Sequence, residues 1–218
     1  MGVNQRLLGF ATSLVLGAVV APSAKAAIWT EGTSPAVFLG GAGPEAVGSG
    51  IDEIRGAISG GDQGDLFKIT FAVGGTLDIL ARGAASDTMN LSLFLFDASG
   101  GGIRVDDNSG PLFSARLIVT ISAGTYFLGI GDDPLRAVDT DGTTWDASGV
   151  ADGAPPPDFG VLDRLQNTGT VVSPGNYRIT LSMLTGDPPV SSVPEPMTLG
   201  LLGAGLLGLA HTRFRRRR

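Results

Sequence analysis

The sequence predicts an all-β fold, either a sandwich or a barrel, for the middle of this 218-residue chain. Between residues 27 and 184, short apolar runs alternate with turn residues, and no long amphipathic helical pattern occurs. The chain also contains 34 glycines, which are too many for helices but suit a fold with many tight turns. The segments on either side of this body are predicted to be targeting signals.

Alternation of apolar and polar residues predicts the strands in order. A half-buried strand is expected at residues 67–73, and Gly74-Gly75 predicts a hairpin turn into a second strand at 77–79. The run Leu91–Phe96 is apolar on both faces apart from one serine, which predicts a central strand covered on both sides. Further strands are expected at 117–121, 126–130 and 177–181.

The segment between the last two of these strands has no clear pattern. Residues 133–174 contain Pro155-Pro156-Pro157 and few apolar positions, and a structureless loop of that length is uncommon in a compact domain. Two interpretations stay open. The segment either forms one or two edge strands near Trp145 and Val161-Leu162, or it is a flap that supplies the functional surface.

The only two tyrosines of the chain lie in similar contexts. Tyr126 and Tyr177 each follow a turn glycine by two residues and begin a strand. This repetition predicts a ring that packs inward while its hydroxyl bonds a loop backbone, as in the tyrosine corner of β-sandwiches. A duplicated ligand site is the alternative.

The N-terminus, residues 1–26, is predicted to be a secretory signal peptide. Arg6 precedes an almost uncharged apolar run at residues 7–21, and small residues then define the expected cleavage site, Ala24, Ala26 and Ala27. The apolar run is short for a membrane span, which favours cleavage over the alternative of an N-terminal anchor. No twin-arginine pair is present, so the general secretion machinery is the expected partner.

The C-terminus predicts a short transmembrane helix followed by a basic stop. Residues 185–193 form a proline- and serine-rich linker, and the predicted span covers residues 197–212. Its uninterrupted apolar part, Met197–Ala210, would reach about 21 Å as a helix, against about 30 Å of bilayer hydrocarbon. The basic tail, residues 213–218, should stay on the cytoplasmic side; its arginines are Arg213, Arg215, Arg216, Arg217 and Arg218.

The C-terminal segment, residues 194–218 together with Val193, has three features that resemble a PEP-CTERM sorting signal. These are the motif Val193, Pro194, Glu195 and Pro196, the short Leu/Gly span, and the terminal arginine run. Such tags occur on exported proteins of Gram-negative, often biofilm-forming, bacteria. The resemblance implies an exosortase-type membrane transpeptidase as partner, an inner-membrane intermediate, and final location in the cell envelope, at the cell surface or in the extracellular matrix. An ordinary single-span tail anchor is the alternative.

Four short motifs between residues 51 and 132 resemble the bacterial pre-peptidase C-terminal family. They are Gly64–Phe71, Leu93–Gly100, Asp106–Asn108 and Ala123–Tyr126. The resemblance implies a jelly-roll-like antiparallel β-sandwich that serves as a non-catalytic accessory or binding module, in some members with bound calcium. The insertion after Asp133 departs from the family pattern, and no peptidase domain accompanies the match.

Composition excludes several classes of function. The chain has no cysteine and one histidine, His211, so thiol catalysis, cysteine-based metal sites and a Ser–His–Asp triad in the body are excluded. Residues 27–193 contain 20 acidic and 8 basic residues, a net charge of −12, whereas the residues from Pro194 onward carry +4. An acidic body is not expected to bind nucleic acid, because that binding needs cations against the phosphates.

Aspartates on predicted loops are the candidate ligands for calcium, which prefers six to eight oxygen atoms. The candidates are Asp62, Asp65, Asp106, Asp107, Asp132 and Asp133. In the alternative interpretation these side chains bond their own backbone in turns and need no metal. A bound calcium ion predicts that chelation by EDTA lowers the melting temperature by several degrees.

The expected function is therefore that of an exported, non-catalytic cell-envelope or extracellular-matrix protein. By association with the tag, a structural or adhesive part in exopolysaccharide or biofilm is expected. A carbohydrate- or calcium-binding accessory module is the alternative, and it predicts an exposed Trp145 beside an acidic loop. A two-carboxylate glycoside hydrolase is the remote alternative, although no motif selects one pair from the 20 acids of the body.

Overall fold

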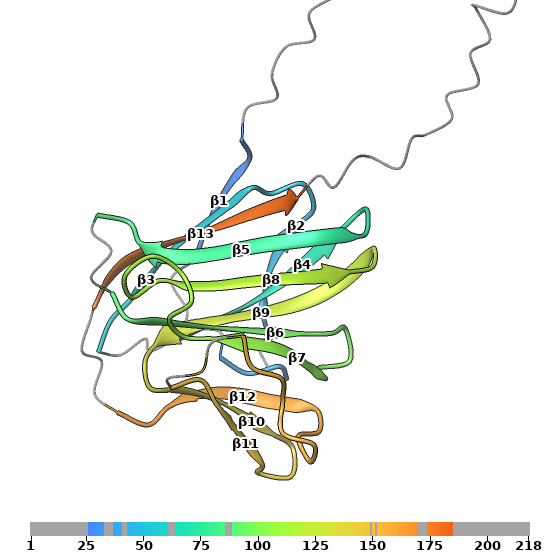
Figure 1. The fold of residues 1–218 in the computed structure, drawn as a ribbon, viewed down its shortest axis with the longest axis vertical. Helices are drawn as coiled ribbons and strands as arrows, with labels where there is room; N and C mark the ends of the chain where they lie inside the picture. Colours follow the sequence, from blue (N-terminus) through green and yellow to red (C-terminus); the bar gives the residue numbers. More distant parts are fainter. Residues whose placement is uncertain are drawn as a thin grey trace, which may run out of the picture.

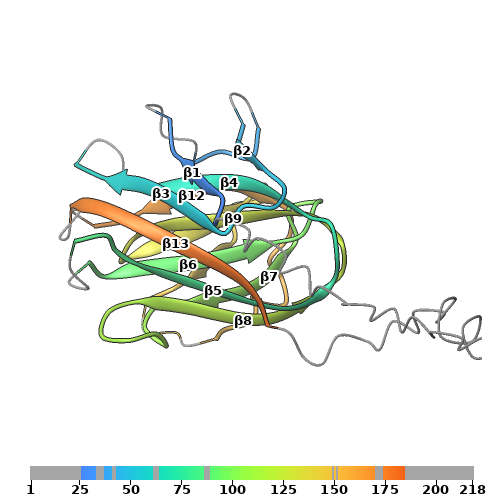
Figure 2. The same ribbon diagram turned by 90° about the horizontal axis from the view of Figure 1, so that it is seen from above.

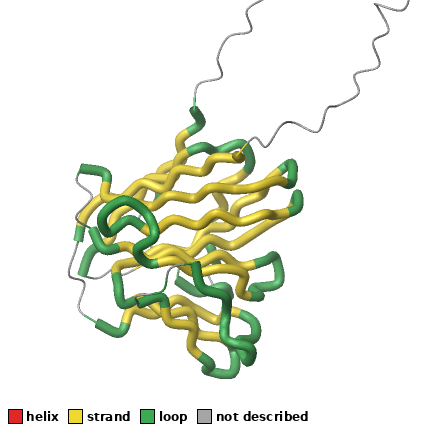
Figure 3. Tube along the Cα trace, in the orientation of Figure 1, coloured by secondary structure: helices red, strands yellow, loops and turns green. Residues whose placement is uncertain are grey.

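The computed structural model describes residues 26–32, 37–40, 43–60, 64–85, 89–148, 150, 152–169 and 174–184. All regular secondary structure in these residues is β (Figure 3). Within this part of the chain no helix is long and apolar enough to cross a membrane. The predicted membrane span, the sorting motif and most of the signal peptide lie outside the described residues.

Two five-stranded sheets form a sandwich, which confirms the predicted fold class (Figures 1 and 2). The first sheet contains, in spatial order, β1 (Ile28–Thr30), β3 (Glu53–Ile58), β13 (Gly175–Leu184), β5 (Gly75–Gly83) and β8 (Ala115–Ile121). The second contains β2 (Glu45–Gly48), β4 (Gly64–Phe71), β9 (Gly124–Asp132), β6 (Leu91–Phe96) and β7 (Gly102–Asp106).

The antiparallel pairing implied by the resemblance to the pre-peptidase C-terminal family does not hold at one edge of each sheet. β1 pairs with β3 in parallel, and β2 pairs with β4 in parallel. In both cases the chain visits the opposite sheet between the two partners, because β2 lies between β1 and β3 in sequence and β3 lies between β2 and β4. No hairpin forces the two partners to run in opposite directions.

The core between the two sheets consists of the inward-facing residues of both. Its completely buried members include Ile54, Phe67, Leu77, Ile79, Leu93, Leu117, Leu128, Tyr177 and Ile179. These positions alternate with exposed or half-buried residues along the first sheet, so the period-two pattern of the sequence follows directly from burial on one face. The predicted strands at 117–121, 126–130 and 177–181 all lie within observed strands.

Gly74-Gly75 does not form the predicted hairpin. β4 belongs to the second sheet and β5 to the first, so the two glycines carry the chain from one sheet to the other. A Cβ at Gly74 would lie 2.8 Å from the backbone oxygen of Ile121, at the end of β8. The glycine therefore permits close contact between this crossing and the crossing that connects β8 with β9.

The segment 133–174 contains a third, three-stranded sheet that packs on the outer face of the second sheet (Figure 1). Its strands, in spatial order, are β11 (Thr144–Asp146), β10 (Leu135–Asp139) and β12 (Leu162–Asn167). Strands therefore lie at both places, near Trp145 and after Val161, where the sequence allows them. Their apolar residues and the outer face of β6 form a second hydrophobic cluster.

Leu91–Phe96 is buried at every position, as the sequence predicts. Leu91, Leu93 and Leu95 face the core between the two large sheets, whereas Phe94 and Phe96 face the third sheet. The strand is apolar on both faces because each face is covered by a different layer.

The exposed Trp145 that the binding-module alternative predicts is not found. Its side chain is only 3% exposed and lies in the second cluster, with ring centroids 5.3 Å from Phe94, 5.9 Å from Phe96 and 5.6 Å from Phe159. A tryptophan held by three aromatic rings is part of a core, so it offers no exposed platform for a sugar ring.

Candidate functional site

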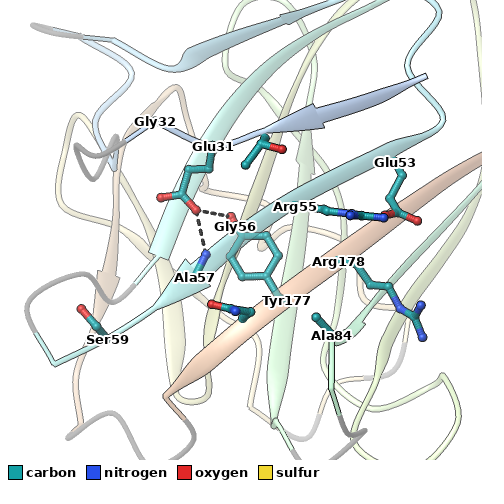
Figure 4. A pocket seen from close by; sticks show the side chains of 12 residues that line it. Glu31, Gly32, Glu53, Arg55, Gly56, Ala57, Ser59, Ala84, Tyr177 and Arg178 are labelled. Atoms are coloured by element: carbon teal, nitrogen blue, oxygen red, sulfur yellow. Dashed lines mark hydrogen bonds and ion pairs between the residues drawn. The ribbon is translucent and has the colours of Figure 1, made fainter. Parts of the chain in front are cut away.

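A cavity of about 640 Å³ opens beside β1, β3 and β13 (Figure 4). Its polar lining comes from these strands and the residues directly after them: Thr30, Glu31, Glu53, Arg55, Ser59, Asn176 and Arg178. It is therefore a mixed-charge site on an otherwise acidic body.

The Tyr177 phenol joins Glu31, which lines the cavity, to Asp65, which is buried and does not line it. The Tyr177 hydroxyl lies 2.7 Å from Asp65 Oδ2 and 3.2 Å from Glu31 Oε2. The Glu31 carboxylate also accepts a hydrogen bond of 2.8 Å from the backbone N–H of Ala57 (Figure 4). Residues from β4 and β13 and the residue directly after β1 are therefore joined through one hydroxyl group.

Gly56 makes room for this network. It pairs with Tyr177 across β3 and β13, and a Cβ at Gly56 would overlap with the Tyr177 hydroxyl and the Glu31 carboxylate. Glycine is required here because the phenol crosses the position that a side chain would fill.

The two tyrosines differ in what their hydroxyls contact. Tyr126 donates a 3.0 Å hydrogen bond to the backbone oxygen of Ser122, as predicted for a tyrosine corner. Tyr177 packs its ring inward as expected, but its hydroxyl contacts carboxylates instead of a loop backbone. Burial, together with the negative charges of Asp65 and Glu31, raises the pKa of Tyr177 well above its usual value.

An arginine row lies on the outer face of the first sheet, partly in the wall of the cavity. Arg55 on β3 pairs with Arg178 on β13, and Arg178 pairs with Arg82 on β5. We call Arg55, Arg178 and Arg82 the arginine row. Arg55 contacts Glu53 on its own strand. Arg82 and Arg178 have buried Nε atoms with no hydrogen-bond partner among the described residues.

The six aspartates predicted as calcium ligands lie at several different places. Asp62 is outside the described residues, and Asp65 contacts Tyr177. Asp106, at the end of β7, accepts hydrogen bonds from the backbone N–H groups of Ser109, Arg116 and Asp152 at 3.1, 2.7 and 3.1 Å. This buried carboxylate therefore fastens three segments of backbone to one another.

The remaining candidates also have protein partners or are buried at strand ends. Asp107 accepts from the side-chain amide of Asn108 at 2.6 Å, and Asp133 accepts from the Ser148 hydroxyl at 2.8 Å. Asp132 is completely buried at the end of β9. Across the described residues no group of three or more His, Cys, Asp or Glu side chains could hold a metal ion.

Asp139, at the end of β10, also accepts hydrogen bonds from backbone N–H groups. A hydrogen bond from the N–H of Gly160, with others from Thr143 and Asp141, lowers the pKa of the Asp139 carboxyl. Asp97 shows the same behaviour: burial would raise its pKa, but hydrogen bonds from Ser99 and Gly101 lower it. These aspartates close turns in the way the alternative interpretation predicts.

The predicted mature N-terminus already has an anionic partner. The backbone nitrogen of Ala27 lies 2.9 Å from Asp52 Oδ2, and the Ala27 oxygen accepts from the N–H groups of Asp52 and Glu53. Cleavage before Ala27 would convert this nitrogen into an α-ammonium group and strengthen the contact, because hydrogen bonds between ions are stronger than neutral ones.

We expect Asp52→Asn to lower the free energy of unfolding by about 0.5–1 kcal/mol in a chain that begins at Ala27. The loss should be smaller in a matched chain with one extra residue before Ala27, because its charged terminus is displaced from Asp52. Urea unfolding of the four proteins gives the coupling energy between the two changes. Equal losses in both backgrounds would contradict the predicted ion pair.

Sequence reasoning missed the two features that define the cavity. Glu31 and Tyr177 are 146 residues apart, and no local pattern indicates that one hydroxyl connects them. The arginine row depends on the register of three strands that are distant in sequence. Only the outward positions of Arg55, Arg82 and Arg178 could have been inferred, from alternation with apolar neighbours.

The comparisons with known proteins concern the body and the tail separately. No curated protein matches the chain. The body is similar in structure to the pre-peptidase C-terminal domain of a collagenase from Bacillus anthracis, with a TM-score of 0.40 and 13% sequence identity. That likeness covers 69% of this chain and 100% of the other.

The tail gives the sequence-based assignment. Residues 192–218 match the model of the PEP-CTERM protein-sorting motif, which confirms the resemblance of Val193–Pro196, the Leu/Gly span and the arginine run. The chain thus carries the PEP-CTERM motif, which marks exported, envelope-associated proteins of Gram-negative bacteria that are sorted by an exosortase.

Proposed function

We propose that this protein is a non-catalytic component of the cell surface or extracellular matrix, with a structural or adhesive part in exopolysaccharide or biofilm. The sorting motif at residues 192–218 is the observation that carries the proposal. Recognition of Pro194, Glu195 and Pro196 would release the body from its membrane intermediate or transfer it to another anchor. The short apolar span supports a transient stay in the membrane, because it is marginal for a permanent one.

The proposal that the protein is not an enzyme rests on the contacts and burial of its acidic residues. Glu31 and Asp65 are the carboxylates that converge on one group at the cavity, and both bond the hydroxyl of Tyr177. Asp65 is 1% exposed, so it is poorly placed to reach a glycosidic bond in a bound sugar chain. Calcium binding stays a prediction, which the EDTA melting experiment tests.

Tail variants in the producing bacterium test the proposal. The full chain should be recovered from the cell surface or matrix without its terminal arginines, as mass spectrometry of the purified protein would show. Replacing Pro194, Glu195 and Pro196 together with alanine should leave the unprocessed chain in the inner membrane and reduce cell adhesion to the level of a gene deletion. As the control, alanine at Ser191 and Ser192 in the linker should leave processing unchanged.

The proposal fails if the native protein retains Arg218 and remains stably in the lipid bilayer. It also fails in its adhesive part if the gene deletion leaves adhesion and matrix content unchanged while the full chain is processed normally.

A carbohydrate-binding accessory role is the second candidate, and the cavity beside β3 and β13 favours it. Hydroxyl, amide and charged groups line this cavity, a composition that suits the many hydroxyl groups of a sugar. A glycan array probed with the exported protein separates this role from a purely structural one, because a structural protein should bind no glycan above background.

A further inference from the structure

The arginine row concentrates positive charge where the body has little of it. Residues 27–193 contain 8 basic residues against 20 acidic ones, and three of the eight lie opposite one another on three neighbouring strands. Adjacent strands are about 4.8 Å apart, so the row extends about 10 Å across the outer face of the first sheet.

This arrangement destabilises the isolated protein. Like charges directly opposite each other on a sheet repel, and here Arg178 has an arginine on both sides. A neutral side chain in place of Arg178, like those of Thr180 and Ser182 on the same face of β13, would avoid this repulsion. An anion from outside would relieve it.

Two members of the row also have unused hydrogen-bonding groups. The Nε–H groups of Arg82 and Arg178 are buried and have no acceptor within the described part of the chain. Other arginines of the body have carboxylate partners: Arg116 donates two hydrogen bonds to Asp78, of 2.9 and 2.7 Å, and Arg136 donates one to Asp146. These Nε atoms are shielded from solvent, so an external ligand would have to bind the terminal Nη groups. Within the described part of the chain neither Arg82 nor Arg178 forms an ion pair, so both charges lack a counter-ion that a bound anion could supply.

We propose that the arginine row binds the carboxylate groups of an acidic polysaccharide. The inference rests on the proposed function, which places the protein among extracellular polymers. A guanidinium presents parallel N–H donors that match the two oxygens of a carboxylate, so the two Nη groups of Arg82 or of Arg178 can bind one uronic acid group in a bidentate manner, while Arg55 already contacts Glu53. A row of arginines then fits a polymer that repeats such a group along its length.

The surroundings of the row favour a sugar chain over a nucleic acid. Neutral hydroxyl and amide groups next to the row, from Thr30, Asn176 and Thr180, can bond sugar hydroxyls. Single-stranded nucleic acids need aromatic side chains on which bases stack, whereas the one aromatic residue in the cavity lining, Tyr177, has its ring completely buried. The net charge of −12 on the body also opposes a polyphosphate more than a chain with one carboxylate per sugar.

The test compares binding of polygalacturonate by the exported protein and by the double variant Arg82→Gln/Arg178→Gln. We expect the dissociation constant to increase about tenfold or more in 50 mM salt, because two charge-assisted contacts are lost. The melting temperature of the variant should stay equal or increase, since the like-charge repulsion is removed. Neither protein should bind dextran, a neutral polysaccharide.

The matched control is Arg136→Gln/Arg164→Gln on β10 and β12, which changes the net charge equally but away from the row. Its dissociation constant for polygalacturonate should remain within about twofold of the original, because its distant charges act only weakly through salt-containing solvent. Equal weakening by the control and the row variant would overturn the assignment to the arginine row, as would no binding by the unchanged protein.

Single-stranded DNA distinguishes the polymer class. Equal affinity for oligothymidylate, lost in the row variant, would overturn the assignment to polysaccharide in favour of a general polyanion site. A protein that is exported and processed but ignores polygalacturonate disproves this inference alone. A protein that binds the polymer but keeps its tail disproves the proposed sorting and leaves the binding site intact.

Discussion

Replacing Trp145 with alanine is expected to lower the free energy of unfolding by about 3–5 kcal/mol. Trp145 joins the third sheet to the second by packing against Phe94 and Phe96. These neighbouring aromatic rings are rigid, so they cannot easily move to fill the cavity that the substitution leaves. The backbone also fits the indole closely, since a Cβ at Gly102 would lie 2.7 Å from its Cζ3. Urea unfolding followed by circular dichroism measures the loss.

The third sheet should be affected first. The apolar residues of the third sheet belong to the second cluster. Trp145→Ala is therefore expected to increase amide exchange in β10, β11 and β12 more than in β5 or β13. Ile118→Ala is the control: Ile118 is 47% exposed on the outer face of the first sheet, and its loss should change stability by about 0.5 kcal/mol or less. A similar small loss for Trp145→Ala would contradict the structural role assigned to the second cluster.

Tyr177→Phe is expected to destabilise the protein by about 1–3 kcal/mol at neutral pH, or more, because it removes the hydroxyl 2.7 Å from the buried Asp65 carboxylate. The original protein should also lose stability in alkali. The pKa of Tyr177 is raised in the folded state, so above pH 10 the unfolded phenol releases its proton while the folded one keeps it. The unfolded state then binds fewer protons, and the free energy of unfolding falls by up to about 1.4 kcal/mol per pH unit.

Urea unfolding between pH 9 and pH 11 checks this expectation. The steep alkaline loss should be weaker in Tyr177→Phe, whereas Tyr126→Phe, which removes a hydroxyl bonded to Ser122, should retain it. An identical pH dependence for the original protein and Tyr177→Phe would show that the buried hydroxyl contributes nothing to the alkaline transition.

Local patterns predicted the strands β4, β5, β6, β8, β9 and β13, but not β1, β2, β3, β7 or β10. The continuous burial of Leu91–Phe96 follows from its apolar residues on both faces, and the tyrosine-corner contact of Tyr126 follows from its place after a turn glycine. Alternation of apolar and polar residues indicates which face of a sheet each side chain lies on, but it does not indicate which strand pairs with which. For this reason the hairpin at Gly74-Gly75 was wrong: two glycines permit a turn within a sheet and a crossing between sheets equally well.

The cavity could not be predicted, because its parts meet only through tertiary pairing. Glu31 follows β1 and Tyr177 lies on β13. Their contact depends on Gly56 of β3, because a side chain at this position would occupy the space between them. The burial of Trp145 was missed for a related reason: residues 133–174 allowed strands near Trp145 and Val161-Leu162, but nothing local indicated that these strands form a separate sheet over β6. The aspartates were recognised as turn residues, and the structure shows which backbone groups Asp106 and Asp139 hold.

The two ends of the folded body lie at one pole of the sandwich. Asp52 bonds Ala27 near the start of the body, and its oxygen accepts from the N–H of Leu181, three residues before the end of β13. The third sheet lies at the opposite end of the molecule (Figure 1). A body tethered through its tail would therefore be held at the pole where Ala27 also lies, with β10, β11 and β12 at the opposite end, directed toward the surrounding medium.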